Sequence, residues 1–195
     1  MSLIRTLEGE PQTEQVQELY ASERRRWGYL PNYAPLFAQR PEVYAGWVAL
    51  NGSVKRGMSA RHYELATLGA ALALGSSYCS LAHGDVLASG HLPAEQVAAI
   101  ARGEDAGLDP ADRAVVAFAG LVARNANRVT DADLVPLRDA GFTDDEIFGV
   151  VLAAAARCFF STVLDATGTL PDAEFGAMPT DLREALTVGR PIATA

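Results

Sequence analysis

Residues 63–84 read YELATLGAALALGSSYCSLAHG, and this stretch decides the expected fold. Its leucines recur at the three- and four-residue spacing of one helix face, not at the alternating spacing of a strand. Gly75 interrupts the pattern, and the serines that follow it are residues that favour helix N-caps. The stretch therefore predicts one helix over residues 59–75 and a second over residues 76–90.

Proline and glycine divide the rest of the chain into segments with the same helical spacing. Long strand-like runs of β-branched or aromatic residues are missing from the sequence. Further helices are expected, in chain order, at residues 13–26, 41–52, a short segment after Pro93, 109–122, 130–141 and 144–166. We therefore expect an all-α fold, a multi-helix bundle in a single helical domain over residues 1–195, with a core motif at 59–90 and a C-terminal tail at 171–195.

The segment 144–166 gives the strongest local signal. Thr143 and Glu146 form a capping box before it, and Phe142 can pack as a staple against Ile147. The segment is rich in alanine and apolar nearly all round, which predicts a central helix that is buried on most sides. The proline-containing tail after it is expected to be either a partner-contacting arm or partly disordered.

Composition limits the possible partners and location. The 195 residues are 49% hydrophobic and 21% charged, which suffices for a sizeable core, and the formal net charge is −8. Such an acidic chain is not expected to bind nucleic acid. Residues 1–10 lack an apolar run of signal-peptide length, and the longest apolar run, 149–156, is too short to span a bilayer. We expect a cytoplasmic protein with no membrane partner.

The chain holds two cysteines, Cys79 and Cys158, which a reducing compartment would keep as thiols. Cys79 falls in the first turn of its helix, where free backbone N–H groups and the helix dipole favour the thiolate. His83 lies four residues on, so the two side chains share a helix face. Glu64, on the preceding helix, could orient that imidazole or relay its proton. Taken alone, the same residues also fit a buried thiol, a packed histidine and a solvated glutamate, which is the commoner situation of each.

The stretch quoted above resembles the core signature of the alkylhydroperoxidase D-like, or carboxymuconolactone decarboxylase, family. That signature is a glutamate, eleven residues, Cys-x-x-Cys, three residues and a histidine. Glu64, Cys79 and His83 stand at the glutamate, the second cysteine and the histidine with every interval kept. Upstream, Leu30-Pro31-Asn32 and Arg40-Pro41-Glu42 are similar to the lead-in of the peroxidase-related branch.

The resemblance implies a thiol-dependent peroxidase that needs no cofactor, in which Cys79 attacks the peroxide while Glu64 and His83 relay protons. Its partners would be a small-molecule hydroperoxide, an external thiol reductant and further copies of the chain in a homo-oligomer. One position departs from the signature, because Ser76 occupies the place of the first cysteine. The resolving thiol must then come from elsewhere, and Cys158, if it is not simply a buried cysteine, is the sole source within the chain.

Other residues leave two readings open. A metal site could use Cys79, His83, Glu64 and His62, but the second cysteine that would strengthen it is missing. Tyr78 could donate a hydrogen bond to a bound peroxide or pack its ring at the helix start. The aromatic residues between the first two long helices could line a substrate pocket or belong to the core or a subunit interface: Trp27, Tyr33, Tyr29 and Phe37.

Two alternatives to the peroxidase remain at this point. The family includes a cofactor-free decarboxylase of a carboxylated lactone, which depends on acid–base residues and need not use a cysteine. A non-catalytic member could instead keep the helical bundle as a binding or assembly module. The serine at position 76 favours both alternatives, because it removes the local dithiol.

Overall fold

The computed structural model describes residues 3–6, 13–104 and 107–194, and within them every regular element is a helix. Most of the N-terminal stretch 1–10, predicted to lack a signal peptide, lies outside the described residues. The long and short α-helices follow in chain order: α1 (Glu14–Trp27), α2 (Ala34–Phe37), α3 (Pro41–Arg56), α4 (Ala60–Leu74), α5 (Ser77–Gly90), α6 (Ala94–Arg102), α7 (Pro110–Asn125), α8 (Asp131–Asp139), α9 (Asp144–Thr167) and α10 (Thr180–Leu186). Two 3-10 helices are η1 (Ala126–Arg128) and η2 (Ala173–Ala177). The all-α prediction is confirmed.

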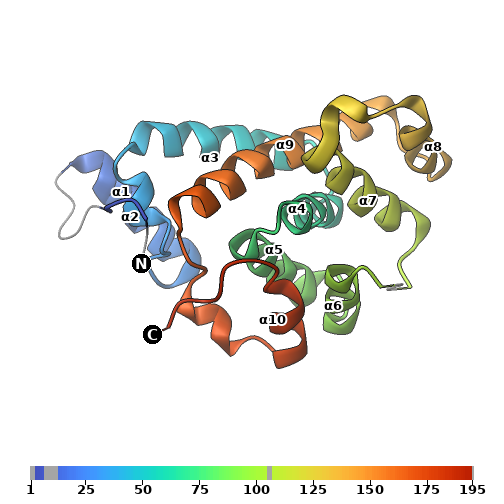
Figure 1. The fold of residues 1–195 in the computed structure, drawn as a ribbon. Helices are drawn as coiled ribbons and strands as arrows, with labels where there is room; N and C mark the ends of the chain where they lie inside the picture. The colour runs from blue at the N-terminus through green and yellow to red at the C-terminus, as the bar shows by residue number, and fades with distance from the viewer. Residues whose placement is uncertain (1–2, 7–12, 105–106, 195) are drawn as a thin grey trace.

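The centre of the bundle is α4, not α9 (Figure 1). Helices α5, α7 and α9 pack around α4, and every residue from Tyr63 to Ala71 is buried. Gly69 makes this close packing possible, since a Cβ there would lie 2.5 Å from the carbonyl oxygen of Val116 on α7. The prediction that 144–166 is the central, mostly buried helix is therefore wrong in part, because the outer side of α9 carries exposed Phe148 and Phe159.

Helix caps fix where the key elements begin. Ser59 accepts a hydrogen bond from the backbone N–H of His62 at the start of α4. Thr143 and Glu146 form the predicted capping box of α9. By length and composition α9 could cross a membrane, but half of its most apolar window is buried inside the protein, as in a core helix.

Two sequence predictions need correction. The helix expected to stop near Gly52 continues to Arg56, because one internal glycine costs only about 1 kcal/mol and burial of Val54 favours the extra turn. The tail after Pro171 is ordered: α10 packs against α5 and α6 (Figure 1), and Phe175 of η2 contacts the Tyr78 ring of α5. Leu186, fully buried at the end of α10, anchors it.

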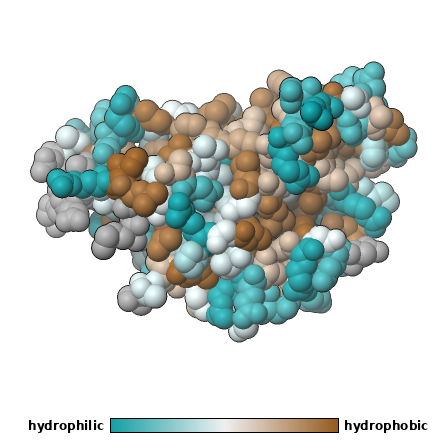
Figure 2. All heavy atoms as spheres, viewed as in Figure 1, coloured by the Kyte–Doolittle hydropathy of each residue, from teal (hydrophilic) through white to brown (hydrophobic). Residues whose placement is uncertain are grey.

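Apolar side chains gather over the middle of the face shown in Figure 2, while hydrophilic ones lie toward its edges. Among the described residues, the exposed apolar side chains include Leu50 on α3 and Phe159 on α9, which are 54% and 42% exposed. Both line one groove between these two helices. The surface of the bundle therefore has an apolar strip along α3 and α9.

Candidate active site

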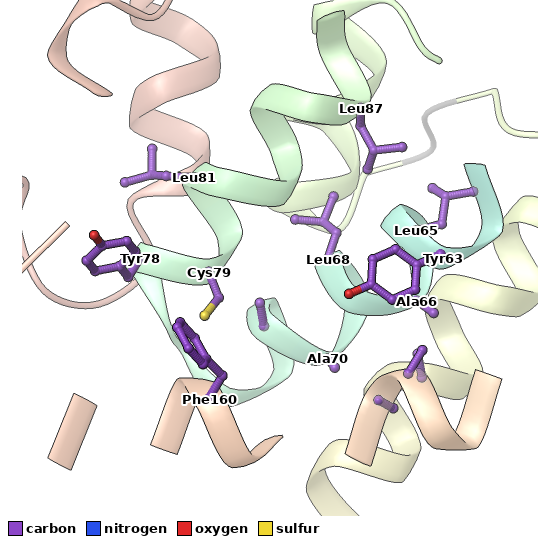
Figure 3. Close-up of a cluster of buried hydrophobic side chains, with 14 of the residues drawn as sticks. Tyr63, Leu65, Ala66, Leu68, Ala70, Tyr78, Cys79, Leu81, Leu87 and Phe160 are labelled. Carbon is purple, nitrogen blue, oxygen red and sulfur yellow. The ribbon is translucent and has the colours of Figure 1, made fainter. Parts of the chain in front are cut away.

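The turn between α4 and α5 places the predicted thiol. Gly75 adopts φ 68°, the left-handed conformation that ends α4, and Ser76 then occupies the N-cap of α5. Cys79 follows in the first turn of α5 and is 1% exposed. Its sulfur points toward the ring of Phe160 on α9 (Figure 3). The thiol is thus held between two helices.

His83 lies one turn beyond Cys79 and contacts α4. Its Nδ1 is 2.5 Å from Oε2 of Glu64, whose other oxygen lies 3.2 Å from Nζ of Lys55 on α3. Lys55 also lies over the Tyr63 ring, 4.6 Å from its centroid. Lys55, Glu64 and His83 thus form a connected chain from the surface to the imidazole.

The protonation states of this pair follow from burial and neighbours. Burial, reinforced by the positive charge of Arg157, lowers the pKa of His83 to about 4 despite the opposing effect of Glu64. Burial alone would raise the pKa of Glu64. The hydrogen bond and charge of His83, together with the charge of Lys55, outweigh the effect of burial and lower this pKa. The imidazole is therefore neutral near pH 7 and the carboxyl is ionised. Nδ1–H then donates to Glu64, which leaves Nε2 as a base.

Arg157 lies on the other side of the thiol. Its Nη1 is 3.4 Å from Sγ of Cys79, and the side chain is 4% exposed. Burial opposes the guanidinium charge, but Cys79 and Tyr63 raise the pKa of Arg157 above its ordinary value. A positive charge and an N–H donor beside the sulfur stabilise a thiolate and any negative charge that develops there.

Cys79, His83, Glu64 and Arg157 all line one cavity of about 120 Å³. The cavity walls are mainly aromatic, and the rings come from α1, the turn before α2, α3, α4, α5, α9 and η2: Trp27, Tyr33, Trp47, Tyr63, Tyr78, Phe160 and Phe175. Trp47 and Phe160 form one wall, with ring centroids 4.3 Å apart. Such a cavity combines an apolar interior with a few placed polar groups, as small-molecule sites do.

Tyr78 points away from the thiol and toward the C-terminal segment. Its hydroxyl donates to Oδ2 of Asp172 at 2.6 Å, and Tyr29 donates to the same oxygen at 3.0 Å. The backbone N–H of Asn32 donates to Oδ1. Burial raises the pKa of Asp172, although these three donors oppose the shift. The Tyr78 side chain therefore lines the cavity, and its hydrogen bond to Asp172 fixes its orientation.

The remaining predicted residues lie as follows. Ser76 is fully buried at the α5 N-cap and makes no side-chain capping bond. Cys158 lies on the outer side of α9 beside Phe159 and outside the cavity lining, and both cysteines are free thiols. Among the aromatic residues, Trp27 and Tyr33 line the cavity and Phe37 belongs to the core.

His62 does not join the other three residues that a metal site would have used. It pairs with Asp112 at 3.6 Å and packs against Phe142, whereas Glu64, two residues further along α4, contacts His83. Across the residues that the structure describes, no group of three or more histidine, cysteine and acidic side chains is arranged to hold a metal.

Sequence reasoning missed Arg157 and Asp172. Arg157 had one signal, since it is the single charged residue within residues 147–164 of a helix predicted to be buried. Asp172 had none, since an aspartate after a proline is typical of a turn and the fold alone brings it beside Tyr78, 94 residues earlier.

Comparison with known proteins agrees with the all-α fold. Residues 41–106 match the model of the carboxymuconolactone decarboxylase family. The fold is similar to that of an uncharacterized peroxidase-related protein with an alkylhydroperoxidase AhpD core from Ralstonia eutropha, with TM-score 0.77, 24% identity, and 91% of this chain and 95% of that chain covered. A peroxidase-related protein from a Silicibacter species gives TM-score 0.79, 20% identity and the same coverage of both chains.

A third similar structure is the debrominase Bmp8 in complex with 2,3,4-tribromopyrrole, with TM-score 0.72, 14% identity, and 95% of this chain and 98% of that chain covered. No curated protein is significantly similar to the chain. The matched core over residues 41–106 and the shared fold support one assignment. Residues 41–106 thus match the carboxymuconolactone decarboxylase family, and the fold of the chain is that of the alkylhydroperoxidase D-like, peroxidase-related proteins.

Proposed function

We propose that this chain is a thiol-dependent peroxidase that reduces a small hydroperoxide through Cys79. The observation that carries the proposal is the meeting of a buried thiol, a neutral histidine oriented by a carboxylate and a buried guanidinium in one cavity. A peroxidatic thiol needs a base to take its proton, an acid to protonate the leaving oxygen and a positive charge to stabilise the anions in between. Each need has a matching side chain here.

The reaction begins when Nε2 of His83 takes the Cys79 proton and the thiolate attacks the terminal peroxide oxygen. An S–O bond forms while the O–O bond breaks, and the departing alkoxide receives the proton from the imidazolium. Cys79 becomes a sulfenic acid and the peroxide becomes an alcohol. Glu64 stabilises the transient imidazolium, and Arg157 stabilises the thiolate and the leaving oxygen.

Reduction requires two external thiols. The first condenses with the sulfenic acid to give water and a mixed disulfide, and the second attacks that disulfide to restore Cys79 as a thiol. Cys158 is placed on the outer side of α9 and Ser76 carries no sulfur, so the resolving step is assigned to a reductant from solution. We also propose that the chain works in the cytoplasm, where small thiols are abundant, and that it acts as a homo-oligomer.

Sulfenic-acid trapping tests the proposal. The protein is treated with cumene hydroperoxide in the presence of dimedone and analysed by intact mass and peptide mapping. We expect one adduct, on Cys79, that is lost in Cys79→Ser and kept in Cys158→Ser. An unmodified Cys79 under excess peroxide would contradict the peroxidase. Turnover of a lactone acid that survives Cys79→Ser would then indicate the decarboxylase, and loss of both activities would indicate a binding module.

The aromatic walls around the thiol favour a second candidate, reductive dehalogenation of a single-ring compound, which the similarity to a debrominase suggests. The Cys79 thiolate would attack the ring halogen, the ring carbon would keep the bonding electrons and take a proton, and an external thiol would release the halide as a disulfide forms. Halide release from a brominated pyrrole by the parent and not by Cys79→Ser would support this reaction.

A further inference from the structure

Two buried N–H donors at the cavity have no partner. The Nε of Arg157 and the Nε1 of Trp47 make no hydrogen bond, although the two side chains are only 4% and 8% exposed. An unsatisfied buried donor costs free energy, so each such group calls for an acceptor. Both side chains line the cavity that contains Cys79. The missing acceptor is therefore expected to come from a bound molecule.

The two donors belong to one wall. The guanidinium carbon of Arg157 lies 5.9 Å from the ring centroid of Trp47 and 5.6 Å from that of Phe160. Across the described residues, Arg157 forms no ion pair with a carboxylate, and its Nη1 hydrogen-bonds to Sγ of Cys79. A buried guanidinium without a carboxylate partner favours an anion.

The other charges facing the cavity leave this preference in place. Glu64 is neutralised by Lys55 and hydrogen-bonded by His83. Asp172 is engaged by Tyr78, Tyr29 and Asn32 on the side away from the thiol. Arg26, at the end of α1, adds a further positive charge to the lining. The unpaired charge beside Cys79 is thus positive.

Size and wall chemistry define the rest of the ligand. The cavity volume of about 120 Å³ approaches the roughly 150 Å³ of an apolar cavity known to bind benzene. Its aromatic walls pack well against a flat ring. We propose that the cavity binds a single-ring aromatic molecule carrying an anionic acceptor group, such as a carboxylate or phenolate, with that group held by Arg157 and Trp47. The inference rests on the proposed function in that a molecule of this class would carry the hydroperoxide group that Cys79 reduces.

Intrinsic fluorescence gives a direct test, because the chain has two tryptophans and both line the cavity. The probes are benzoate, its neutral isostere benzamide and the non-planar cyclohexanecarboxylate, titrated into Cys79→Ser so that no chemistry interferes. We expect saturable quenching by benzoate at millimolar or lower concentration, with the other two probes about tenfold weaker. Benzamide binding as tightly as benzoate, or an absence of saturable quenching by benzoate, would overturn the proposal.

Two further measurements locate the anion. Arg157→Met should remove the preference for benzoate over benzamide and Arg157→Lys should retain part of it, with helical content checked by circular dichroism. In the parent, benzoate should slow alkylation of Cys79 while leaving Cys158 unaffected, which needs no variant. Equal protection of both thiols would overturn the assigned site.

The outcomes separate this inference from the proposed function. If benzoate binds and Cys79 never forms a sulfenic acid, the ligand class stands and the peroxidase fails. If Cys79 is oxidised and benzoate does not bind, the peroxidase stands and the ligand class is wrong.

Discussion

The inner and outer sides of α9 carry adjacent residues with opposite environments. On the inner side, Arg157 contacts Cys79 and meets the neutral His83 across an aromatic cavity. On the outer side, Cys158 lies among apolar side chains, and burial raises the pKa of its thiol. The two thiols differ little in intrinsic chemistry. What differs is access to a base, a charge and a cavity, so reactivity in this protein is expected to follow the neighbours of each sulfur.

The largest effect should come from removing the base on the inner side. His83→Asn keeps a donor for Glu64 but cannot take a proton, so we expect the rate of peroxide oxidation of Cys79 to fall by about 10²–10⁴-fold. The rate is measured by timed dimedone trapping. His91→Asn, at the C-cap of the same helix and outside the cavity, is the matched control and should react as the parent does. A loss of less than about threefold in His83→Asn would contradict a general-base role.

The titration of His83 tests the same environment without a reaction. Burial and Arg157 lower its pKa to about 4, against about 6.5 for an ordinary histidine, a more than hundredfold lower proton affinity. Imidazole resonances followed by NMR should show this midpoint.

The lowered pKa of His83 makes the stability of the folded chain depend on pH. The unfolded chain binds the His83 proton at higher pH than the native chain does, so this part of the stability is present above pH 6.5 and is lost as the pH falls toward 4. Glu64 acts in the same direction at lower pH, because its pKa is lowered from 4.5 to about 2. Urea midpoints should therefore decrease on acidification. A His83 that titrates near 6.5 would contradict the described burial.

Alkylation compares the two thiols directly. We expect Cys79 to react about tenfold faster than Cys158 with a small reagent such as methyl methanethiosulfonate at pH 7, because Arg157 lies beside its sulfur and His83 provides a base in the same cavity. Peptide mapping after short exposure gives both rates in one sample. Equal or reversed labelling would show that burial of Cys79 outweighs its activation.

The contrast between the two sides of α9 also shows what the sequence could and could not predict. Local signals predicted the turn at Gly75, the position of Cys79 in a first helical turn and the capping box at Thr143, since each depends on residues within a few positions. They did not predict which side of α9 faces the thiol. Periodicity is uninformative in a segment that is apolar nearly all round, so exposed Phe159 and buried Arg157 could not be told apart.

The remaining features could not be predicted because they depend on contacts between segments that are distant in the sequence. Asp172 reaches Tyr78 because η2 and α10 fold back over α5, an arrangement that no short-range pattern signals. The tail was therefore expected to be an arm or partly disordered. The cavity is likewise closed by residues of α1, α3, α4, α5 and α9 and of the C-terminal segment, so its aromatic lining could not be separated from core on sequence alone.

A substitution on the outer side of α9 is expected to have a smaller effect, on self-association and not on thiol reactivity. Phe159 and Leu50 expose apolar surface along one groove, which favours contact with a second copy of the chain. We expect the parent to have at least twice the monomer mass in light scattering, and Phe159→Glu to reduce it to the monomer. Val135→Glu, an exposed apolar position on α8, should leave the mass unchanged. A monomeric parent at micromolar concentration would contradict self-association.

The smallest expected change is a mass loss of two hydrogens in a variant, and it tests whether a cysteine at position 76 can form a disulfide with Cys79. Ser76 is fully buried at the N-cap of α5, three residues before Cys79 in the same first turn. Ser76→Cys should place a second sulfur where Cys-x-x-Cys pairs form redox disulfides.

On peroxide treatment, intact mass should show that this variant loses two hydrogens, while the parent stops at a sulfenic acid or a mixed disulfide. Adding Cys158→Ser to the variant should leave the disulfide intact, because Cys158 lies outside the cavity. A parent that itself closes a bridge between Cys79 and Cys158 would break the comparison between the two sides of α9, since the outer thiol would then have to reach the inner one. Such a bridge would keep the peroxidase chemistry but make Cys158, not a thiol from solution, the resolving residue.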